Sequence, residues 1–234
     1  MLKIFKNIEG VKVFMSEKKD GNMKLFSADF DINRGKYLKK NNLDYEKLIS
    51  AKLEHGGNIK IIKNSREKFI DYTDGLLTDN SEIILSVTSA DCLPIFLFDP
   101  INKVVGILHC GWRSVAKGII ENALEKMIND FKSKPENILV GIGPGIQKCH
   151  FEVRDDLTKN FSNCKRFIAN RNNKEYFDLT GLSKEKFILN KIKLDNIEID
   201  NRCSYCEDNL WSYRRDGEDK REIRSGIAGI AINN

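Results

Sequence analysis

The sequence is poor in histidine, tryptophan and proline, with 3, 2 and 4 of these residues among 234. It has no apolar run near the roughly 20 residues of a membrane-spanning helix, which disfavours an integral membrane protein. Its first residues mix charged with apolar side chains and show no cleavage-site pattern, so we expect no signal peptide. No internal repeat or Pro/Ser-rich linker divides the chain. We therefore expect a single domain over residues 1–234.

Charge and cysteine content indicate in which compartment the protein works and which classes of partner it lacks. The 39 basic and 34 acidic side chains give a formal net charge of +5, without the clustered basic face of a nucleic-acid-binding protein. Six cysteines without a secretory signal indicate a reducing, cytoplasmic environment. There, cysteines are more often metal ligands, catalytic groups or buried side chains than disulfides. We expect a monomer with neither a nucleic-acid nor a membrane partner.

The hydrophobic pattern predicts a mixture of strands and helices, which is typical of an α+β fold class. The expected strands are Lys3–Phe14, Ile59–Ile62, Ile83–Thr88, Leu93–Phe98, Val104–Leu108, Ile138–Ile142, Ile197–Ile199 and Ser225–Ile232. The expected helices are Asn41–Glu54, capped by Asn42 or Asp44, a helix from Ser114 to Phe131 capped by Ser114, and Leu182–Leu194, capped by Thr180 or Ser183.

The segment around residues 99–102 predicts a β-hairpin. Two apolar runs of strand length flank this Asp-Pro-Ile-Asn sequence, in which Asp-Pro favours a turn and Asn tolerates the left-handed conformation. A loop centred there pairs residue 98 with residue 103. The same register places Cys92 opposite His109, with Cβ atoms roughly 4.5–5.5 Å apart. A thiolate and an imidazole at this separation can share one metal ion or one proton.

Two chemistries fit Cys92 and His109, and the residues alone leave both open. In the first, the imidazole activates the thiol as the nucleophile of a cysteine hydrolase. In the second, both bind a zinc ion, and His55, which precedes a Gly-Gly pair, is the third ligand. Three protein ligands plus a water molecule are typical of catalytic zinc. A plain structural role for these side chains is the remaining alternative.

Arginines beside aromatic residues indicate an anion-binding site. Arg113 follows Trp112, and Arg214 follows Tyr213. Guanidinium groups match phosphate or carboxylate oxygens, and aromatic rings stack on planar bases, whereas the alternative is a surface salt bridge. Asp91 is a candidate acid or base of the reaction. The alternative is that it only makes structural hydrogen bonds.

Cys203 and Cys206 have the spacing of two zinc ligands. A structural zinc site needs two more ligands, usually from a second close pair. The sequence offers no such pair, since Cys149 and His150 are adjacent and Cys164 is isolated. A redox role would require a βαβ setting that the pattern does not show. We therefore expect Cys203 and Cys206 to pack or to support a neighbouring site.

Five motifs stand in order between about residue 50 and the C-terminus. They are Ala90-Asp-Cys-Leu-Pro94, His109-Cys-Gly-Trp-Arg113, Gly143-Pro-Gly-Ile146 with Cys149 and Glu152-Val153, Cys203-Ser-Tyr-Cys206, and Ser212-Tyr-Arg-Arg-Asp-Gly217. This combination resembles the YfiH/YlmD family, also known as the laccase-domain or polyphenol oxidase family, whose mammalian relative is FAMIN. The resemblance implies a single-domain, four-layer α/β/β/α sandwich with mixed sheets.

The resemblance also implies a cytoplasmic, zinc-dependent purine nucleoside phosphorylase. Its substrates would be phosphate and adenosine, inosine, guanosine or methylthioadenosine, and it would also deaminate adenosine. By the family's motifs, the Zn2+ ligands are His55, Cys92 and His109. Cys92 and His109 are then catalytic residues, Asp91 is our candidate acid, and the expected phosphate-binding or substrate-binding residues are Arg113 and Arg214.

Other functions are weighed by what each would require. A cysteine-dependent amide hydrolase that edits peptidoglycan precursors, a role also attached to bacterial members of the family, requires that alkylation of Cys92 abolish activity without any metal. A copper oxidase, as the older family name suggests, is disfavoured because three histidines cannot supply a multicopper site. A non-enzymatic zinc protein leaves the arginine–aromatic clusters unexplained.

Overall fold

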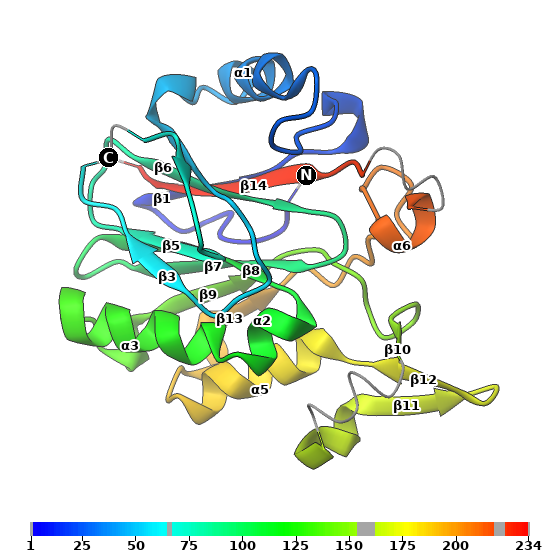
Figure 1. The fold of residues 1–234 in the computed structure, drawn as a ribbon. Helices are drawn as coiled ribbons and strands as arrows, with labels where there is room; N and C mark the ends of the chain where they lie inside the picture. The colour runs from blue at the N-terminus through cyan, green and yellow to red at the C-terminus, as the bar shows by residue number, and fades with distance from the viewer. Residues whose placement is uncertain (1, 65–66, 154–161, 218–222, 234) are drawn as a thin grey trace.

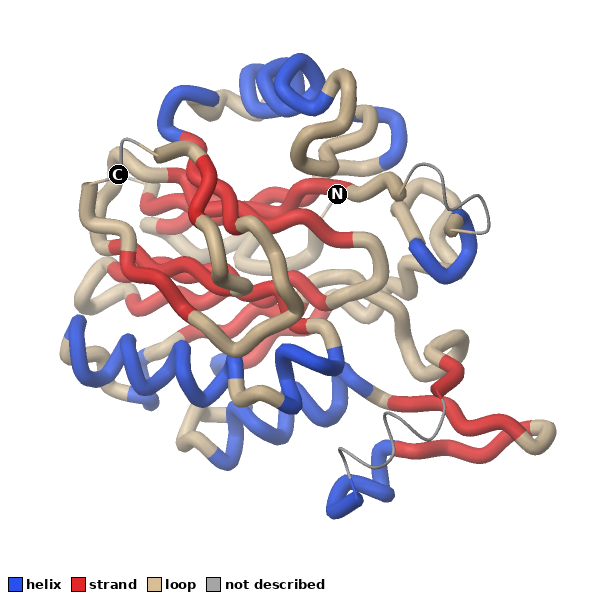
Figure 2. The backbone as a smooth tube through the Cα atoms, in the orientation of Figure 1, coloured by secondary structure: helices blue, strands red, loops and turns tan. Residues whose placement is uncertain are grey.

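Two β-sheets stack face to face between two layers of helices, as the ribbon and the tube both show (Figures 1 and 2). The structure is a computed structural model that describes residues 2–64, 67–153, 162–217 and 223–233, without the side chains of residues 162–164. The side chain of Cys164 therefore lies outside the described residues. The α/β/β/α order confirms the predicted α+β class and its four layers.

Each large sheet mixes parallel and antiparallel pairs. In the first, β2 (Leu48–Ala51) runs parallel to β6 (Ile84–Ser89) and β4 (Phe69–Ile70). In the second, β3 (Ile59–Ile61) runs parallel to β5 (Gly75–Thr78), and β13 (Ile197–Ile199) runs parallel to β9 (Leu139–Ile142). The first sheet has the order β1 (Val11–Met15), β14 (Gly226–Ile232), β6 (Ile84–Ser89), β2 (Leu48–Ala51), β4 (Phe69–Ile70). The second has the order β13 (Ile197–Ile199), β9 (Leu139–Ile142), β7 (Leu93–Asp99), β8 (Val104–Cys110), β5 (Gly75–Thr78), β3 (Ile59–Ile61). A small third sheet consists of β10 (Glu152–Val153), β12 (Lys174–Phe177) and β11 (Ile168–Arg171).

Helices cover the outer faces of the two large sheets. In Figure 1, α1 (Phe30–Lys40) lies over the first sheet, whereas α3 (Ile119–Phe131) and α5 (Leu179–Leu189) lie under the second. The shorter helices are α2 (Trp112–Ala116) and α6 (Tyr213–Asp216). The described 3-10 helices are Lys18–Asp20, Tyr45–Lys47, Pro135–Asn137, Ser162–Phe167 and Leu194–Asn196. No described helix is both long enough and apolar enough to cross a bilayer.

Three buried clusters of apolar side chains fill the three interfaces between the four layers. The strand β7 shows how they are divided. Leu93, Ile95 and Leu97 belong to the cluster between the second sheet and the helices α3 and α5, whereas Phe96 and Phe98 belong to the cluster between the two sheets. Successive side chains of a strand point to opposite faces, and both faces of this sheet are covered. The central strands therefore read as unbroken apolar runs.

The predicted helix Asn41–Glu54 is wrong. A 3-10 turn at Tyr45–Lys47, capped by the Asp44 side chain, leads directly into β2, whose four residues are all buried. β2 lies between β6 and β4, so its apolar residues serve two covered faces rather than one helix face. The helix in this region, α1, precedes the predicted one. It escapes the apolar pattern because its fully buried Arg34 reads as a surface residue.

Two predicted helices are present with different starts. The one from Ser114 is divided into α2 and α3 at Gly118, whose φ of +78° ends the first helix, and Ser114 lies inside α2 rather than capping it. The third begins at Leu179 and is capped by Asp178, which accepts the Gly181 N–H. Thr180 and Ser183 are therefore inside α5. Its last residue is Leu189 rather than Leu194.

The predicted hairpin is confirmed, but its register differs by two residues. Asp99 is the last residue of β7 and pairs with Val104, so the loop is residues 100–103. The Asp99 carboxylate accepts two N–H groups of that loop, which extends the strand to this residue. His109 consequently pairs with Pro94, and Cys92 is not its direct partner. A shift of two residues keeps the same face, so Cys92 and His109 still lie on one side.

Candidate metal centre

A cavity of about 470 Å³ lies where β7 begins and β8 ends. Its lining combines the three side chains that the sequence singles out as ligands with the arginine–aromatic pairs at residues 112–113 and 213–214. Much of the remaining wall is formed by Thr88, Ser89, Ala90, Phe151, Leu179 and Ile223. The cavity therefore joins a possible metal centre to possible anion and ring contacts.

His55, Cys92 and His109, the first cluster, come together from three separate segments. One possible ligand atom from each lies within 4.8 Å of the other two. His109 is a buried residue of β8, and Cys92 directly precedes β7. His55 is an exposed loop residue with a φ of +55°, a left-handed conformation that is uncommon outside glycine. This donor set of one sulfur and two imidazoles fits the three-ligand pattern of catalytic zinc.

Asp74 holds the first cluster together, and the sequence showed it only as part of an Asp-Gly turn. Its Oδ1 lies 2.9 Å from His109 Nδ1 and also accepts the His55 N–H at 2.9 Å. Its Oδ2 accepts the N–H groups of Glu54 and Gly56 at 3.1 and 2.7 Å. A proton on Nδ1 is thereby held by Asp74, and Nε2 of His109 is left for a metal ion, as in carboxylate–histidine–zinc arrangements.

The loop that carries His55 is also fastened from the opposite side. Lys117 Nζ donates to the His55 carbonyl at 3.1 Å, and Asn122 donates to the Gly57 carbonyl at 2.9 Å. A Cβ at Gly57 would collide with the Lys117 carbonyl, so only glycine permits this approach. The junction of α2 and α3 thus positions a ligand that stands more than 60 residues earlier in the chain.

The charges of the first cluster favour a thiolate. Burial raises the pKa of the Cys92 thiol, but His109 and His55 lower it more, to about 6. Burial lowers the pKa of His109, whereas Cys92 and Asp74 raise it to about 10. Without a metal, this is an ion pair of thiolate and imidazolium. A metal ion would displace the imidazolium proton and bind a sulfur that is already deprotonated.

Gly111 keeps the space in front of the sulfur open. A Cβ at this position would lie 2.8 Å from Cys92 Sγ and 3.4 Å from a His55 ring carbon. Its φ of −77° suits any residue, so alanine fits the backbone but displaces the ligands.

We expect Gly111→Ala to weaken zinc binding by about 10- to 100-fold, as other changes beside metal ligands do, with the fold retained. Zinc titration with a competing chelator measures the affinity, and circular dichroism the fold. The matched control is Gly35→Ala in α1, where no atom lies within 4 Å of the new Cβ. Equal zinc affinity in both variants would contradict the role of Gly111.

Asp91 and Arg214 are joined at the rim of the cavity. Asp91 has a φ of +89°, and its carboxylate accepts the Ser204 hydroxyl at 2.6 Å and the Arg214 N–H at 2.7 Å. The Arg214 guanidinium donates to the carbonyls of His150 and Glu152 at 3.3 and 3.1 Å. These bonds make Asp91 a residue that positions Arg214, and its predicted role as an acid stays a prediction.

Arg113 also borders the cavity, beside the first cluster. Its guanidinium carbon lies 4.2 Å from the centre of the Trp112 ring, a cation–π arrangement. The neighbouring Arg215 has a different role, because it donates to four carbonyls between Ser204 and Leu210 and so braces that loop. Arg113 and Arg214 are thus the arginines of the two motifs that line the cavity.

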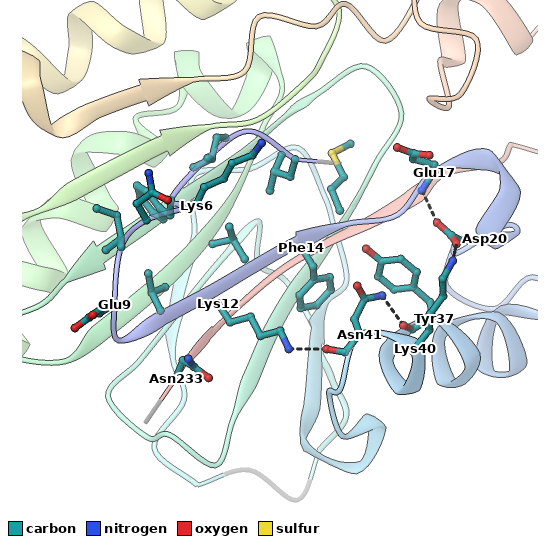
Figure 3. Close-up of a pocket in the computed structure, with 18 of the residues that line it drawn as sticks. Lys6, Glu9, Lys12, Phe14, Glu17, Asp20, Tyr37, Lys40, Asn41 and Asn233 are labelled. Atoms are coloured by element: carbon teal, nitrogen blue, oxygen red, sulfur yellow. Dashed lines mark hydrogen bonds and ion pairs between the residues drawn. The ribbon is translucent and has the colours of Figure 1, made fainter.

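A larger hollow of about 730 Å³ lies along β1 and α1 (Figure 3). Its labelled side chains are mainly charged, and Lys12 Nζ donates to the Asn41 carbonyl at 2.5 Å. The described residues that line it include neither histidine nor cysteine. The cavity at the first cluster is therefore the better candidate for catalysis.

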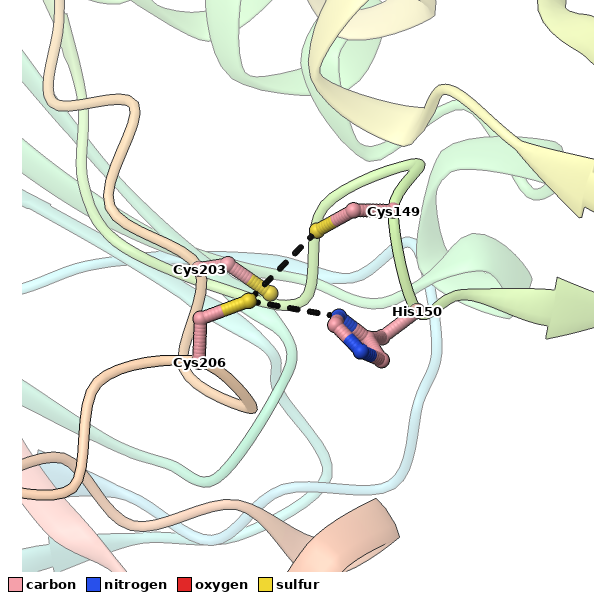
Figure 4. Close-up of side chains that lie close together, drawn as sticks. All are labelled: Cys149, His150, Cys203 and Cys206. Atoms are coloured by element: carbon pink, nitrogen blue, oxygen red, sulfur yellow. Dashed lines mark hydrogen bonds between the residues drawn. The ribbon is translucent and has the colours of Figure 1, made fainter.

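The expectation that Cys203 and Cys206 lack partners is wrong. Cys149 and His150 lie beside them, with ligand atoms within 4.8 Å, and the four side chains point toward one another (Figure 4). Adjacent residues can bind one ion when a turn directs both side chains to the same side. Spacing along the sequence could not reveal this, because the two halves are separated by the segment that forms β10 to β13.

Comparisons with known proteins agree with this architecture. The family model described as multi-copper polyphenol oxidoreductase laccase matches residues 27–227. A purine nucleoside phosphorylase of Deinococcus radiodurans is 31% identical over 145 residues, which cover 61% of this chain and 56% of that protein. One of Clostridium acetobutylicum is 29% identical over 172 residues, which cover 71% of each. The crystal structure of YlmD from Geobacillus stearothermophilus has the same fold, with a TM-score of 0.87, 23% identity and coverage of 96% of this chain and 93% of that one. The chain therefore belongs to the multi-copper polyphenol oxidoreductase laccase family, which is the YfiH/YlmD family that its motifs resemble.

Proposed function

We propose that the protein is a zinc-dependent purine nucleoside phosphorylase acting on adenosine, inosine, guanosine and methylthioadenosine. The observation that carries the proposal is the shared cavity, in which His55, Cys92 and His109 lie beside Arg113 and Arg214. Relatives named purine nucleoside phosphorylase support the reaction class. A site that combines a metal, cationic side chains and aromatic rings suits a substrate with a planar base and a second substrate that is an anion.

The reaction needs an anion held near the sugar. A phosphate oxygen forms a bond to C1′ of the ribose, the bond between C1′ and the purine nitrogen breaks, and the base leaves with the electron pair. Arg113 and Arg214 would hold the phosphate, since guanidinium groups bind phosphate oxygens in pairs. Arg214 already has its position set by Asp91 and two carbonyls. A rigid anion site of this kind costs little reorganisation during the reaction.

The first cluster would act on the purine side of the substrate. A bound zinc ion would supply a Lewis acid that stabilises negative charge developing in the transition state. Asp74 keeps His109 in the tautomer that can bind it. Asp91 remains our candidate for the proton donor to the departing base. The same centre would support deamination of adenosine, the second activity in this proposal.

Removing either arginine provides the test. We expect Arg113→Ala and Arg214→Ala each to lower kcat/KM for phosphate by about 10- to 100-fold, the loss of one charged hydrogen bond. Inosine with phosphate should yield hypoxanthine and ribose 1-phosphate, measured by chromatography. The control is Arg166→Ala, which removes a guanidinium paired with Glu185 outside the cavity. Wild-type protein that is fully loaded with zinc yet inert on every purine nucleoside would contradict the proposal.

A cysteine-dependent amide hydrolase is the second candidate, and one observation favours it. Cys92, His109 and Asp74 form a chain of thiol, imidazole and carboxylate, which is the arrangement of a nucleophile, its base and the group that orients the base. This function requires amide turnover, for instance of peptidoglycan precursors, by metal-free protein. Alkylation of Cys92 should then abolish turnover, whereas chelators should not.

A further inference from the structure

A second cluster of possible metal ligands takes no part in the proposed phosphorolysis. This second cluster consists of Cys149, His150, Cys203 and Cys206. The first two belong to the loop between β9 and β10, and the last two to the loop that precedes α6. Figure 4 shows all four side chains directed toward one another. We propose that the second cluster is a structural zinc site that fastens these two loops together.

The spacing of the second cluster suits a tetrahedral ion. Four ligands around zinc, with Zn–S bonds of about 2.3 Å and Zn–N bonds of about 2.0–2.1 Å, require separations of about 3.8 Å between sulfurs and about 3.5 Å from sulfur to nitrogen. Cys149 Sγ lies 3.8 Å from Cys206 Sγ, and His150 Nδ1 lies 3.2 Å from Cys206 Sγ. The three cysteines are free thiols.

The backbone around Cys203 is arranged to hold a thiolate. The Gln147 N–H donates to Cys203 Sγ at 3.4 Å, across the two loops. The Cys203 carbonyl accepts the N–H groups of Cys206 and Glu207, which folds Cys203 to Cys206 into a tight turn. The turn thus presents both sulfurs to one side.

The histidine is held in the orientation that the site needs. The His150 ring stacks on Tyr205 with centroids 4.1 Å apart and planes 15° apart. This leaves Nδ1 facing Cys206, and the stacked ring restricts rotation away from it. Nδ1 is therefore the nitrogen that would bind zinc.

Arginines surround the loops that supply the ligands. Arg171 donates to the carbonyls of Lys148 and Cys149, Arg214 to that of His150, and Arg215 to those of Ser204 and Tyr205. Three thiolates and a neutral imidazole around Zn2+ carry one net negative charge. Guanidinium groups at this border would offset that charge.

The donor set selects both the metal and its role. Thiolate and imidazole ligands favour zinc among the common divalent ions, and four protein ligands leave no open position for a substrate. The loops also connect to the catalytic cavity, through the Ser204–Asp91 bond and the Arg214–His150 bond. The second ion would therefore stabilise the fold and keep Arg214 in place, without taking part in the reaction.

Metal counting in the purified protein tests the proposal independently of the phosphorylase function. Elemental analysis should find about two zinc ions per chain in the wild type, one in each cluster. Cys92→Ala, which disables the first cluster, should retain about one. Adding Cys206→Ser to Cys92→Ala should remove it. Cys206 is exposed, so serine is compatible with folding. Cys92→Ala protein that folds but holds no zinc would overturn the proposal.

Ligand exchange at His150 separates metal binding from packing. On the Cys92→Ala background, His150→Cys should keep the zinc, because a thiolate replaces the imidazole, whereas His150→Ala should lose it. Cobalt substitution gives a second readout, since the thiolate-to-cobalt absorption should fall in the Cys206→Ser double variant.

Thermal unfolding then tests the structural role. A strong chelator should lower the Tm of Cys92→Ala and leave the Tm of Cys92→Ala with Cys206→Ser unchanged. A chelator that shifts both equally, or neither, contradicts a structural ion at the second cluster. A disulfide between two of these cysteines, detected as missing free thiols in denatured protein, would likewise overturn it.

Discussion

Cys92→Ala should lose the metal of the first cluster together with nucleoside phosphorolysis. The sulfur is one of three ligands and the only anionic one, so two imidazoles alone would hold zinc weakly. Without the ion, stabilisation of the charge that develops on the base is lost. We expect kcat/KM to fall by at least about 100-fold, the scale of removing one electrostatic group from an active site.

The matched control is Cys110→Ala, which removes the thiol of the next cysteine along the chain. Cys110 is fully buried among the apolar side chains between the second sheet and the helices α3 and α5. It belongs to neither cluster of possible metal ligands. Cys110→Ala should reduce stability modestly while leaving zinc content and turnover intact. Wild-type turnover by Cys92→Ala protein that has lost the metal of the first cluster would refute the metal-dependent mechanism. Loss of turnover in Cys92→Ala protein that keeps as much zinc per chain as the wild type would instead support the thiol as a nucleophile.

Asp74→Asn should damage the first cluster without touching a ligand. Each carboxylate oxygen accepts two N–H groups, so an amide would turn an NH2 group toward two donors. A buried donor without an acceptor costs about 1–3 kcal/mol of unfolding free energy. Loss of the charge behind His109 should also weaken zinc binding by about 10- to 100-fold. Chemical denaturation and chelator competition measure the two effects.

Asp99→Asn provides the comparison for Asp74→Asn. Asp99 is also fully buried and also accepts backbone N–H groups, but it closes the β7–β8 loop at the far end of the hairpin. It should lower stability and leave the zinc affinity unchanged. If both variants lost equal zinc affinity, Asp74 would act only through general destabilisation.

The Asp74 carboxylate also predicts that the metal-free protein loses stability at acid pH. Burial raises the pKa of Asp74, but His109 and the backbone N–H groups lower it more, so the folded pKa lies below the ordinary 3.8. Its stabilising contribution is complete above the ordinary pKa and is lost as the pH falls through the folded value. Wild type should therefore lose more stability than Asp74→Asn below pH 3.8, measured by denaturation at several pH values.

Local sequence patterns predicted much of the fold. Largely apolar runs bounded by turns form β7, β8, β9 and β14, and most strands of the two large sheets lie where the pattern predicts. The errors arose where tertiary contacts outweigh local spacing. β2 is a strand because β6 and β4 cover it, and α1 escaped notice because Arg34 is buried, where it donates to the Met23 carbonyl and the Ser50 hydroxyl.

The two clusters of possible metal ligands show the same limit of local sequence patterns. Cys92 and His109 share a hairpin, so their proximity follows from a local turn, even with the register displaced by two residues. His55 was a candidate ligand because it precedes a Gly-Gly pair, but its spacing could not place it near the other two, and only the resemblance to a family did so. Spacing gave no signal for the contact of Asp74 with His109 or of Cys149 with Cys206, because these pairs are 35 and 57 positions apart.

By itself, the sequence determined the family and the alternation of strands and helices, and it predicted the three possible ligands of the first cluster from the family's motifs. Only the tertiary structure decided which carboxylate contacts His109, which arginines line the cavity, and that four further side chains able to bind a metal come together. Turns and strand periods are properties of neighbouring residues. Contacts between distant loops depend instead on how four layers pack, and no local pattern records that packing.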